Sequence, residues 1–335
     1  MITPKSVADR TGAAPNVLMR TPVAQPHQAR TEGCMMIRGL LPVVPTPFDH
    51  GQFDQSSFRR LLEHMLPHLD GYTLLGSTGE APSLTVQERM WITEFALDCT
   101  PAGKAVVVGV SSTCLEDSVS LARHADRYGA HGVLCSAPYY YVNTANGVYS
   151  YLARIDAEIE RDLVLYDNPA STGTVLRADD VIEWSQRLSH LRTVKLTDHD
   201  LTKVGVWQHA GISVLAGDDP IIAQFLAAHV DGAMVIAPAI FPESARLAWD
   251  LIVAGDDEPA FGVLATDILP FVHAFGIGDE IATTKAILAD MGIFNSKEVR
   301  LPLEPASEAR QRLLRRAYNA CRGASERYPL LKSTG

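Results

Sequence analysis

The sequence predicts an α/β protein built as a (β/α)8 TIM barrel with a C-terminal helical extension. Eight short apolar runs alternate with segments of helical periodicity over most of the 335 residues, a succession typical of parallel sheets. These runs are apolar on both faces, as strands covered by helices must be. There is no antiparallel hairpin signal such as Asn-Gly between paired runs. Since no Gly-x-Gly-x-x-Gly follows the first strand, a closed barrel is favoured over the alternative, a doubly wound open sheet.

Each expected strand is short and is bounded by turn or helix signals. The eight strands are expected at residues 39–44, 72–75, 105–109, 132–135, 163–166, 193–195, 212–216 and 232–236. A helix is expected after each strand, and the helix that begins near Thr85 shows the pattern most plainly. There Val86, Met90 and Phe95 recur at helical spacing and form an apolar face.

The chain is expected to have three parts. Residues 1–36 contain Pro, Thr and Arg but no apolar core, so we expect a disordered leader rather than a secretory signal. Residues 37–255 are expected to form the barrel. Residues 256–335 are expected to form the helical extension, with three helices at about residues 259–275, 279–291 and 306–321.

Composition narrows the possible partners and the cellular location. With 47% hydrophobic residues and a formal net charge of -10, and without a basic run, the chain is not expected to bind nucleic acid or an anionic membrane. No apolar run approaches the ~18–20 residues that a membrane span needs. The cysteines are odd in number and show no metal-ligand spacing, which indicates free thiols in a reducing cytoplasm and no zinc site. They are Cys34, Cys99, Cys114, Cys135 and Cys321.

In a barrel the active site lies at the carboxyl ends of the strands. That rule selects a set of candidate residues without reference to any motif. They are Thr46, residues 76–80, Ser111, residues 139–141, Tyr166, Lys195, residues 217–219 and residues 236–238. This set contains one lysine and no histidine, and it shows no cluster with metal-ligand spacing, so we expect no catalytic metal.

Lys195 is the strongest candidate for a catalytic residue in this set. A lysine that ends an apolar strand is exposed, paired, or kept neutral and nucleophilic. A neutral amine there can add to a ketone or aldehyde and form a Schiff base, and desolvation favours the free amine. The alternative is a salt-bridged lysine that caps a strand. Tyr166 ends the neighbouring strand and could relay protons, or it could simply fill the barrel top.

Three further patterns have both functional and structural interpretations. Gly76, Ser77 and Thr78 offer backbone N–H groups and hydroxyls before a helix, which suits a carboxylate or phosphate, although such clusters also form plain loops. The tyrosines at residues 139–141 indicate loop chemistry or an interface patch. The aspartates at residues 218–219 are expected to cap the following helix rather than to catalyse.

Taken together, several stretches resemble one family, the pyruvate-dependent class I aldolases related to dihydrodipicolinate synthase and N-acetylneuraminate lyase. Their order and spacing agree over about residues 37–325. The matching stretches are Pro-Thr-Pro-Phe at 45–48, Gly-Ser-Thr-Gly-Glu at 76–80, Pro-Tyr-Tyr at 138–140, Leu-Tyr-Asp-Asn-Pro at 165–169 with Thr-Gly at 172–173, Val-Lys at 194–195, Gly-Asp-Asp at 217–219 and Gly232.

This resemblance implies a fold, an assembly and roles for individual residues. It implies a barrel with a helical extension, assembled as a homotetramer of two tight dimers. Lys195 would form the Schiff base with pyruvate or another 2-keto acid, and Tyr166 would be the catalytic tyrosine. Ser77 and Thr78 would hold the keto-acid carboxylate, while Tyr140 would cross the dimer interface to complete a proton relay. No cofactor is implied beyond the covalent lysine imine.

The departures from the family pattern concern the substrate. Ser171 stands where dihydrodipicolinate synthases carry an arginine for the second substrate, and the Lys-x-Thr of Lys195 and Thr197 is closer to the sugar-acid branches. The remaining expected substrate contacts are Gly76, Thr46, Gly217 and Met234. We therefore expect a lyase that makes or cleaves a C–C bond next to the pyruvoyl unit of a 2-keto-3-deoxy sugar acid, a sialic-acid-like substrate or another 2-keto acid. The alternatives are 4-hydroxy-tetrahydrodipicolinate (dihydrodipicolinate) synthase, a keto-deoxy sugar acid dehydratase, and a keto-acid-binding regulatory protein.

Overall fold

A ring of parallel strands forms the centre of the protein. The computed structural model describes residues 36–275 and 278–321, so the expected leader lies outside the described residues except for Met36. The strands of the ring are β1 (Gly39–Leu40), β4 (Gly71–Leu74), β5 (Ala105–Gly109), β6 (Gly132–Ser136), β7 (Asp162–Asp167), β8 (Leu191–Leu196), β9 (Ser213–Ala216) and β10 (Gly232–Ala233).

The ring is closed between its first two strands. Hydrogen-bonded neighbours run in the order β1-β10-β9-β8-β7-β6-β5-β4, all parallel. Beyond the end of β1, Val43 pairs with Thr73 of β4, and the Thr73 N–H donates to the Pro42 carbonyl at 2.8 Å. The Val44 N–H donates back to the Thr73 carbonyl at 2.9 Å. The (β/α)8 barrel predicted from the sequence is therefore confirmed.

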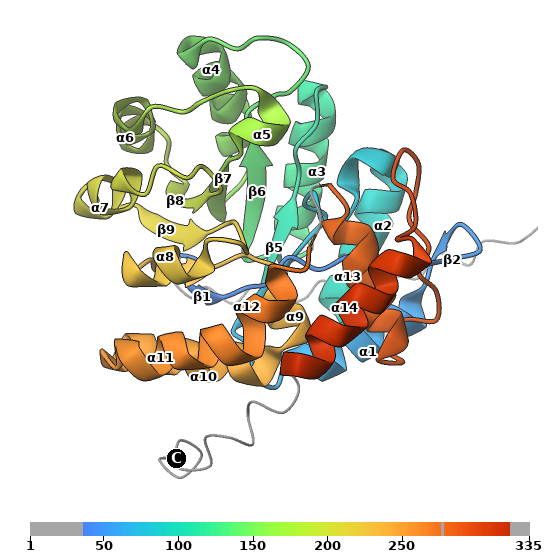
Figure 1. Cartoon of the computed structure of the whole chain (residues 1–335). Coiled ribbons are helices and arrows are strands. Elements are labelled where there is room, and N and C mark those ends of the chain that lie inside the picture. Colours follow the sequence, from blue (N-terminus) through green and yellow to red (C-terminus); the bar gives the residue numbers. More distant parts are fainter. Residues whose placement is uncertain (1–35, 276–277, 322–335) are drawn as a thin grey trace, which may run out of the picture. The chain divides into compact units, whose positions relative to one another are not determined.

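Helices surround the strands on the outside of the ring (Figure 1). Local caps begin two of them: the Asp54 carboxylate accepts from the Ser56 and Ser57 N–H groups at the start of α1, and Thr85 forms a capping box with Glu88 at the start of α2. The helices up to residue 254 are α1 (Gln55–Met65), α2 (Val86–Cys99), α3 (Leu115–Arg127), α4 (Ala145–Asp156), α5 (Pro169–Thr172), α6 (Ala178–Arg187), α7 (Thr202–His209), α8 (Ile222–Ala227), α9 (Ala237–Ile240) and α10 (Pro242–Ala254), with a short 3-10 turn η1 (Ala81–Ser83).

One small antiparallel hairpin lies beside the barrel, although the sequence carries no Asn-Gly signal for it. Strands β2 (Phe48–Asp49) and β3 (Gln52–Phe53) pair antiparallel after β1. The two residues between them, His50 and Gly51, have φ values of 49° and 75°, and a two-residue turn with both φ values positive matches the twist of paired strands. The hairpin gave no Asn-Gly signal in the sequence because its turn uses His-Gly.

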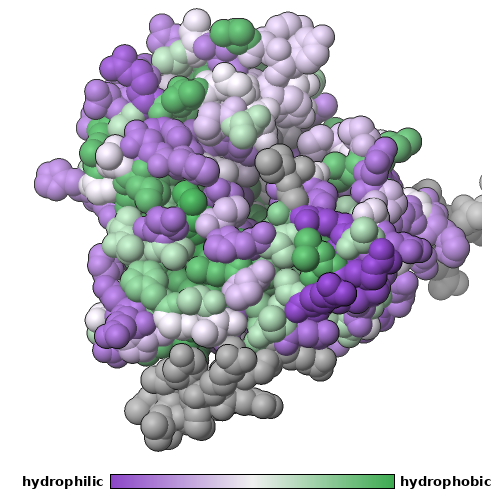
Figure 2. Space-filling view, viewed as in Figure 1, coloured by the Kyte–Doolittle hydropathy of each residue, from purple (hydrophilic) through white to green (hydrophobic). Residues whose placement is uncertain are grey.

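The C-terminal extension and the barrel belong to one compact unit. The first expected helix is divided by a π-helical turn, η2 (Leu264–Ile268), into α11 (Asp257–Val263) and α12 (Leu269–Val272). It is followed by α13 (Glu280–Asp290) and α14 (Glu308–Cys321). Leu314 and Cys321 face inward from α14, while the outward surface of this helix is strongly hydrophilic (Figure 2).

Apolar side chains fill two zones separated by the strands. The larger zone lies between the strands and the outer helices, and the smaller one fills the ring and continues onto α12, α13 and α14. This is the alternation expected of barrel strands, whose successive side chains point to opposite faces. The side chains of the ring interior include Leu41, Val107, Leu134, Val164, Tyr166, Leu215 and Met234. Among residues 36–275 and 278–321, no helix is both long and apolar enough to cross a membrane.

Candidate functional site

Lys195 and Tyr166 meet at the carboxyl ends of adjacent strands. They are register partners of β8 and β7, and the Lys195 Nζ lies 4.1 Å from the centroid of the Tyr166 ring. Both residues are buried, with 4% and 8% of their surfaces exposed. Within the described part of the chain Lys195 forms no ion pair. The pairing of these strand ends, predicted from the sequence, therefore brings an ammonium group to an aromatic face instead of to a carboxylate.

The phenol of Tyr166 is surrounded by groups that favour its ionised form. Burial alone raises the pKa of Tyr166. The charge of Lys195 opposes this effect, as do the nearby polar side chains of Thr197 and Ser77. The pKa of the Tyr166 phenol therefore lies below its ordinary value. A phenol in this state can exchange a proton with a group bound beside the lysine.

The Gly-Ser-Thr-Gly-Glu segment follows β4 as a tight loop. Within it the Glu80 N–H donates to the Ser77 carbonyl at 3.0 Å, and the Thr46 hydroxyl donates to the Gly79 carbonyl at 2.7 Å. Thr46 therefore holds the loop rather than presenting its hydroxyl to a ligand. Ser77 is exposed, and its side chain is one of the groups that lower the pKa of the Tyr166 phenol. This loop is thus connected to the Lys195 and Tyr166 pair.

The remaining two members of the predicted loop motif flank Ser77. Gly76 is half-buried, and its carbonyl accepts from the Ala81 N–H at 3.3 Å. Thr78 is buried, with 8% of its surface exposed. The structure thus presents Ser77, and not Thr78, as the accessible hydroxyl of this loop in the chain as described.

The loop is anchored from behind by the C-terminal extension. Glu80 ends the loop with a left-handed backbone (φ 55°) and forms a fully buried ion pair with Lys285 of α13. Its second oxygen accepts from the Arg300 N–H at 2.8 Å. Burial lowers the pKa of Lys285 to about 8, although Glu80 acts in the opposite direction. The extension therefore fixes the loop through charges that are removed from water.

Thr197 and Gly217 lie together at the ends of β8 and β9. A Cβ atom added to Gly217 would come within 2.6 Å of the Leu196 carbonyl oxygen and 2.7 Å of the Thr197 hydroxyl. Glycine is therefore required by close packing at this position. Met234 follows the register pair of Ala233 and Ala216, which puts it at the level of Gly217, and it is fully buried in the ring interior.

Two predicted site residues lie outside the Lys195 cluster. The hydroxyl of Ser171, on the short helix α5, accepts from the Asn168 side chain at 3.0 Å, and the residue is exposed. Tyr140 is 87% exposed, has a φ of 87°, and packs its ring edge-to-face against Tyr141 at 5.2 Å. In the part of the chain that the structure describes, neither side chain forms a hydrogen bond or a ring contact with Lys195 or Tyr166.

The two aspartates that follow β9 have different partners. The buried Asp219 carboxylate accepts from the Ile236 and Ala237 N–H groups, both at 2.7 Å, and burial raises its pKa to about 6. Asp219 therefore holds the start of α9, not the helix that directly follows it as predicted. Asp218 instead lies 2.9 Å from the His199 Nε2 at the rim of the barrel.

Sequence reasoning missed the buried charges behind the strand ends. Lys203 on α7 pairs with Asp167 and Asp198, which directly follow Tyr166 and Thr197 in the chain. No periodicity or motif indicates which carboxylate a helix lysine will meet. In the described ranges no group of three or more His, Cys, Asp or Glu residues could hold a metal ion.

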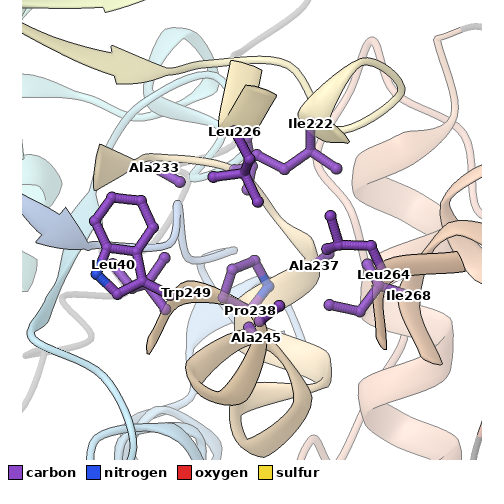
Figure 3. A pocket seen from close by; sticks show the side chains of 12 residues that line it. Leu40, Ile222, Leu226, Ala233, Ala237, Pro238, Ala245, Trp249, Leu264 and Ile268 are labelled. Carbon is purple, nitrogen blue, oxygen red and sulfur yellow. The ribbon is translucent and has the colours of Figure 1, made fainter. Parts of the chain in front are cut away.

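A separate apolar cavity of about 30 Å³ carries none of this chemistry. As Figure 3 shows, side chains of α8 and η2 face one another across it, with Trp249 and Leu40 on another side. Its lining is almost entirely aliphatic or aromatic carbon, so it offers a ligand no polar partners. We interpret it as a packing void between β1, β10 and the helices next to them.

The fold and the position of these polar groups indicate the class of protein. A (β/α)8 barrel with ionisable groups gathered at the carboxyl ends of its strands is the architecture of a barrel enzyme. Residues 36–320 match the model of the Dihydrodipicolinate synthetase family. The chain belongs to this family of class I aldolases and is an enzyme of the lyase class.

Several curated relatives and solved structures are similar to almost the whole chain. The 4-hydroxy-tetrahydrodipicolinate synthase of Phenylobacterium zucineum is 29% identical, over 82% of this chain and 94% of the relative. That of Thermosipho africanus is 27% identical, over 85% and 99%. The crystal structure of dihydrodipicolinate synthase from Thermotoga maritima is 27% identical, with a TM-score of 0.81 over 85% and 98%. A structure described as the first monomeric dihydrodipicolinate synthase variant is 26% identical, with a TM-score of 0.81 over 87% and 98%.

Proposed function

We propose that the enzyme makes or cleaves a C–C bond next to the pyruvoyl unit of a 2-keto acid, through an imine on Lys195. The observation that carries this proposal is the buried Lys195 ammonium, which lies against the Tyr166 ring without a carboxylate partner in the described residues. A lysine in such surroundings is not committed to an ion pair. It can therefore give up its proton and attack a carbonyl carbon.

The chemistry proceeds by addition and dehydration. The free amine of Lys195 adds to the C2 carbonyl, and the carbinolamine loses water to give an imine. The protonated imine then accepts the electron pair of the neighbouring C–C bond as that bond breaks, or stabilises C3 as a nucleophile when the bond forms. Tyr166 moves protons to and from the carbinolamine. Ser77 and the N–H groups of its loop hold the substrate carboxylate. No cofactor is required.

The imine is tested by trapping it. Borohydride reduction in the presence of pyruvate, followed by intact mass measurement, is expected to show one stable adduct per chain. Lys195→Ala is expected to give none. As a control, Lys297→Ala removes a lysine that pairs with Asp290 at 2.9 Å in the extension and is expected to keep the adduct. Thermal stabilisation by pyruvate without an adduct in the wild type would instead indicate a keto-acid-binding regulatory protein.

The substrate proposed is a 2-keto-3-deoxy sugar acid or a sialic-acid-like molecule. Support comes from Ser171, which places a small neutral side chain on α5, and from the hydroxyl of Thr197 beside Tyr166. A hydroxylated substrate can bond to such groups. A panel of 2-keto acids, followed for pyruvate release and for loss of water, distinguishes aldol cleavage from dehydration.

A second candidate is 4-hydroxy-tetrahydrodipicolinate synthase itself. It is supported by the names of the relatives from Phenylobacterium zucineum and Thermosipho africanus. It predicts condensation of pyruvate with aspartate semialdehyde, for which Ser171 supplies no cation. We expect kcat/KM for that pair to be well below that for the best sugar acid. Comparable values would favour the synthase.

The proposed assembly is a cytoplasmic homotetramer of two tight dimers. Support comes from three adjacent exposed side chains, Tyr140, Tyr141 and Val142, which are 87%, 76% and 99% exposed. A cluster of exposed aromatic residues beside a site favours burial against a partner. Tyr140 from one subunit then completes the proton relay of another. Sedimentation of the purified chain tests this, and a monomer, as described for one relative, would contradict it.

A further inference from the structure

A buried lysine connects the outward sides of strands β7 and β8. Asp167 ends β7 directly after Tyr166, and Asp198 directly follows Thr197. Because successive side chains of a strand point to opposite faces, Asp167 faces the surrounding helices rather than the barrel interior. Lys203, in the first turn of α7, meets both carboxylates. Its Nζ lies 2.9 Å from the Asp167 Oδ2 and 2.5 Å from the Asp198 Oδ2.

These three groups are largely removed from water. The Asp167 side chain is fully buried and that of Lys203 is 6% exposed, while Asp198 keeps 22%. The other oxygen of Asp167, Oδ1, is buried without a hydrogen-bond partner among the residues that the structure describes. Burial raises the pKa of Asp167, and Lys203 acts against this effect. The charge of this carboxylate therefore depends on Lys203.

If its role were only to attach α7 to the barrel, this ion-pair cluster would be energetically unfavourable. A cation in the first turn of a helix opposes the helix dipole. Apolar side chains of similar size often replace buried ion pairs without loss of stability, and Lys203 already packs over the Trp207 ring at 5.6 Å. Charge-assisted hydrogen bonds differ from apolar contacts because they fix the positions of particular atoms.

We infer that Lys203 is a positioning residue, which fixes the strand ends that place Tyr166 and Thr197 around Lys195. The backbone transmits this restraint to the site: the Thr197 N–H donates to the Asp167 carbonyl at 2.9 Å, one residue beyond the register pair of Tyr166 and Lys195. The inference rests on the proposed imine chemistry, and it adds a residue outside the barrel interior to that site.

The test measures imine formation in the full chain with pyruvate as the probe. For Lys203→Met we expect the limiting rate of borohydride-trappable imine formation to fall about 10–100-fold, the cost of misplacing a reacting group by about 1 Å. The pyruvate concentration for the half-maximal rate is expected to stay within about twofold, because the loop at residues 76–79 is untouched. Lys297→Met is the matched control, and its rate is expected to equal that of the wild type.

Two further variants separate positioning from folding. Lys203→Arg keeps a cation that can reach both carboxylates, so most of the rate is expected to return. The double variant Asp167→Asn with Lys203→Met removes the unpaired buried charge, so it is expected to regain thermal stability but not the rate. Recovery of the wild-type rate in the double variant, or a wild-type rate in folded Lys203→Met, would overturn the positioning role. A wild type without any adduct would overturn the proposed function itself.

Discussion

Lys195 and Lys285 are buried to nearly the same degree, yet their surroundings are opposite. Both ammonium groups lie about equally close to an aromatic ring, 4.1 Å from Tyr166 and 4.2 Å from Phe48. Lys285 also forms an ion pair with Glu80 and donates to the Glu298 carbonyl at 2.8 Å. Lys195 has no ion pair among the described residues, and its aromatic neighbour carries an ionisable hydroxyl.

We propose that this difference suits the two buried lysines to two purposes. A carboxylate beside a lysine stabilises the charged form and makes the pair a fixed point of the fold. Lys195, without such a carboxylate, is not committed to an ion pair among the described residues. Glu80 thus ends the loop at residues 76–80 beside Lys285, whereas a phenol, rather than an acid, lies beside Lys195.

The largest expected effect is a difference in the free energy of unfolding between variants of the two lysines. Lys285→Met leaves Glu80 buried without its cation, so we expect the free energy of unfolding to fall by about 3–5 kcal/mol. Lys195→Met replaces a buried cation by an apolar side chain of similar length, and we expect a change below about 1.5 kcal/mol or a gain in stability. Urea unfolding followed by circular dichroism measures both. Equal losses in the two variants would contradict the comparison.

Local sequence patterns predicted the strand ends, but they could not predict ion pairs between residues far apart in the sequence. The apolar runs placed Tyr166 and Lys195 at adjacent strand ends, because one helix between two buried strands fixes a parallel pair. Nothing local joins Glu80 to Lys285, which are separated by most of the chain. The same is true of Lys203 and Asp167, because the partner of a charged side chain depends on the packing of a whole helix against the sheet.

The site was predictable to the extent that it lies on regular strands. Thr197 and Gly217 sit at strand ends, and the structure brings them together. Ser171 lies on a helical turn of four residues, α5, and Tyr140 lies on a loop with a positive φ. Backbone conformations of this kind have no hydrophobic period, so the position of such side chains cannot be derived from a pattern.

The Tyr166 hydroxyl beside Lys195 is a second feature that distinguishes Lys195 from Lys285, and it can be removed by itself. Tyr166→Phe keeps the ring against the ammonium and removes only the hydroxyl, which we propose moves protons. We expect kcat to fall about 100-fold, equivalent to ~2.7 kcal/mol in the barrier, with little change in the free energy of unfolding. Steady-state assays and urea unfolding measure the two quantities.

A tyrosine beside another cation provides the control for this variant. The Arg187 guanidinium lies 4.0 Å from the Tyr149 ring, away from the barrel interior. Tyr149→Phe is expected to leave kcat unchanged. If Tyr166→Phe also retained the wild-type kcat, the phenol would be an aromatic neighbour of Lys195 and no more.

The smallest expected effect concerns the ion pair of Glu88 with Arg300, which is partly exposed to solvent. The Arg300 hydrogen bond, together with those of Thr85, lowers the pKa of Glu88 to about 2 from 4.5, against the effect of burial. A carboxyl with a lowered pKa in the folded state stabilises the protein above pH 4.5, and this contribution is lost as the pH falls toward 2. For Glu88→Gln we therefore expect a loss of only about 0.5–1 kcal/mol at pH 7, since water screens the pair, and a smaller loss at pH 3. Unfolding of Glu88→Gln and of the exposed-pair variant Glu183→Gln at both pH values provides the measurement; a loss independent of pH would show that the amide disrupts the helix cap instead.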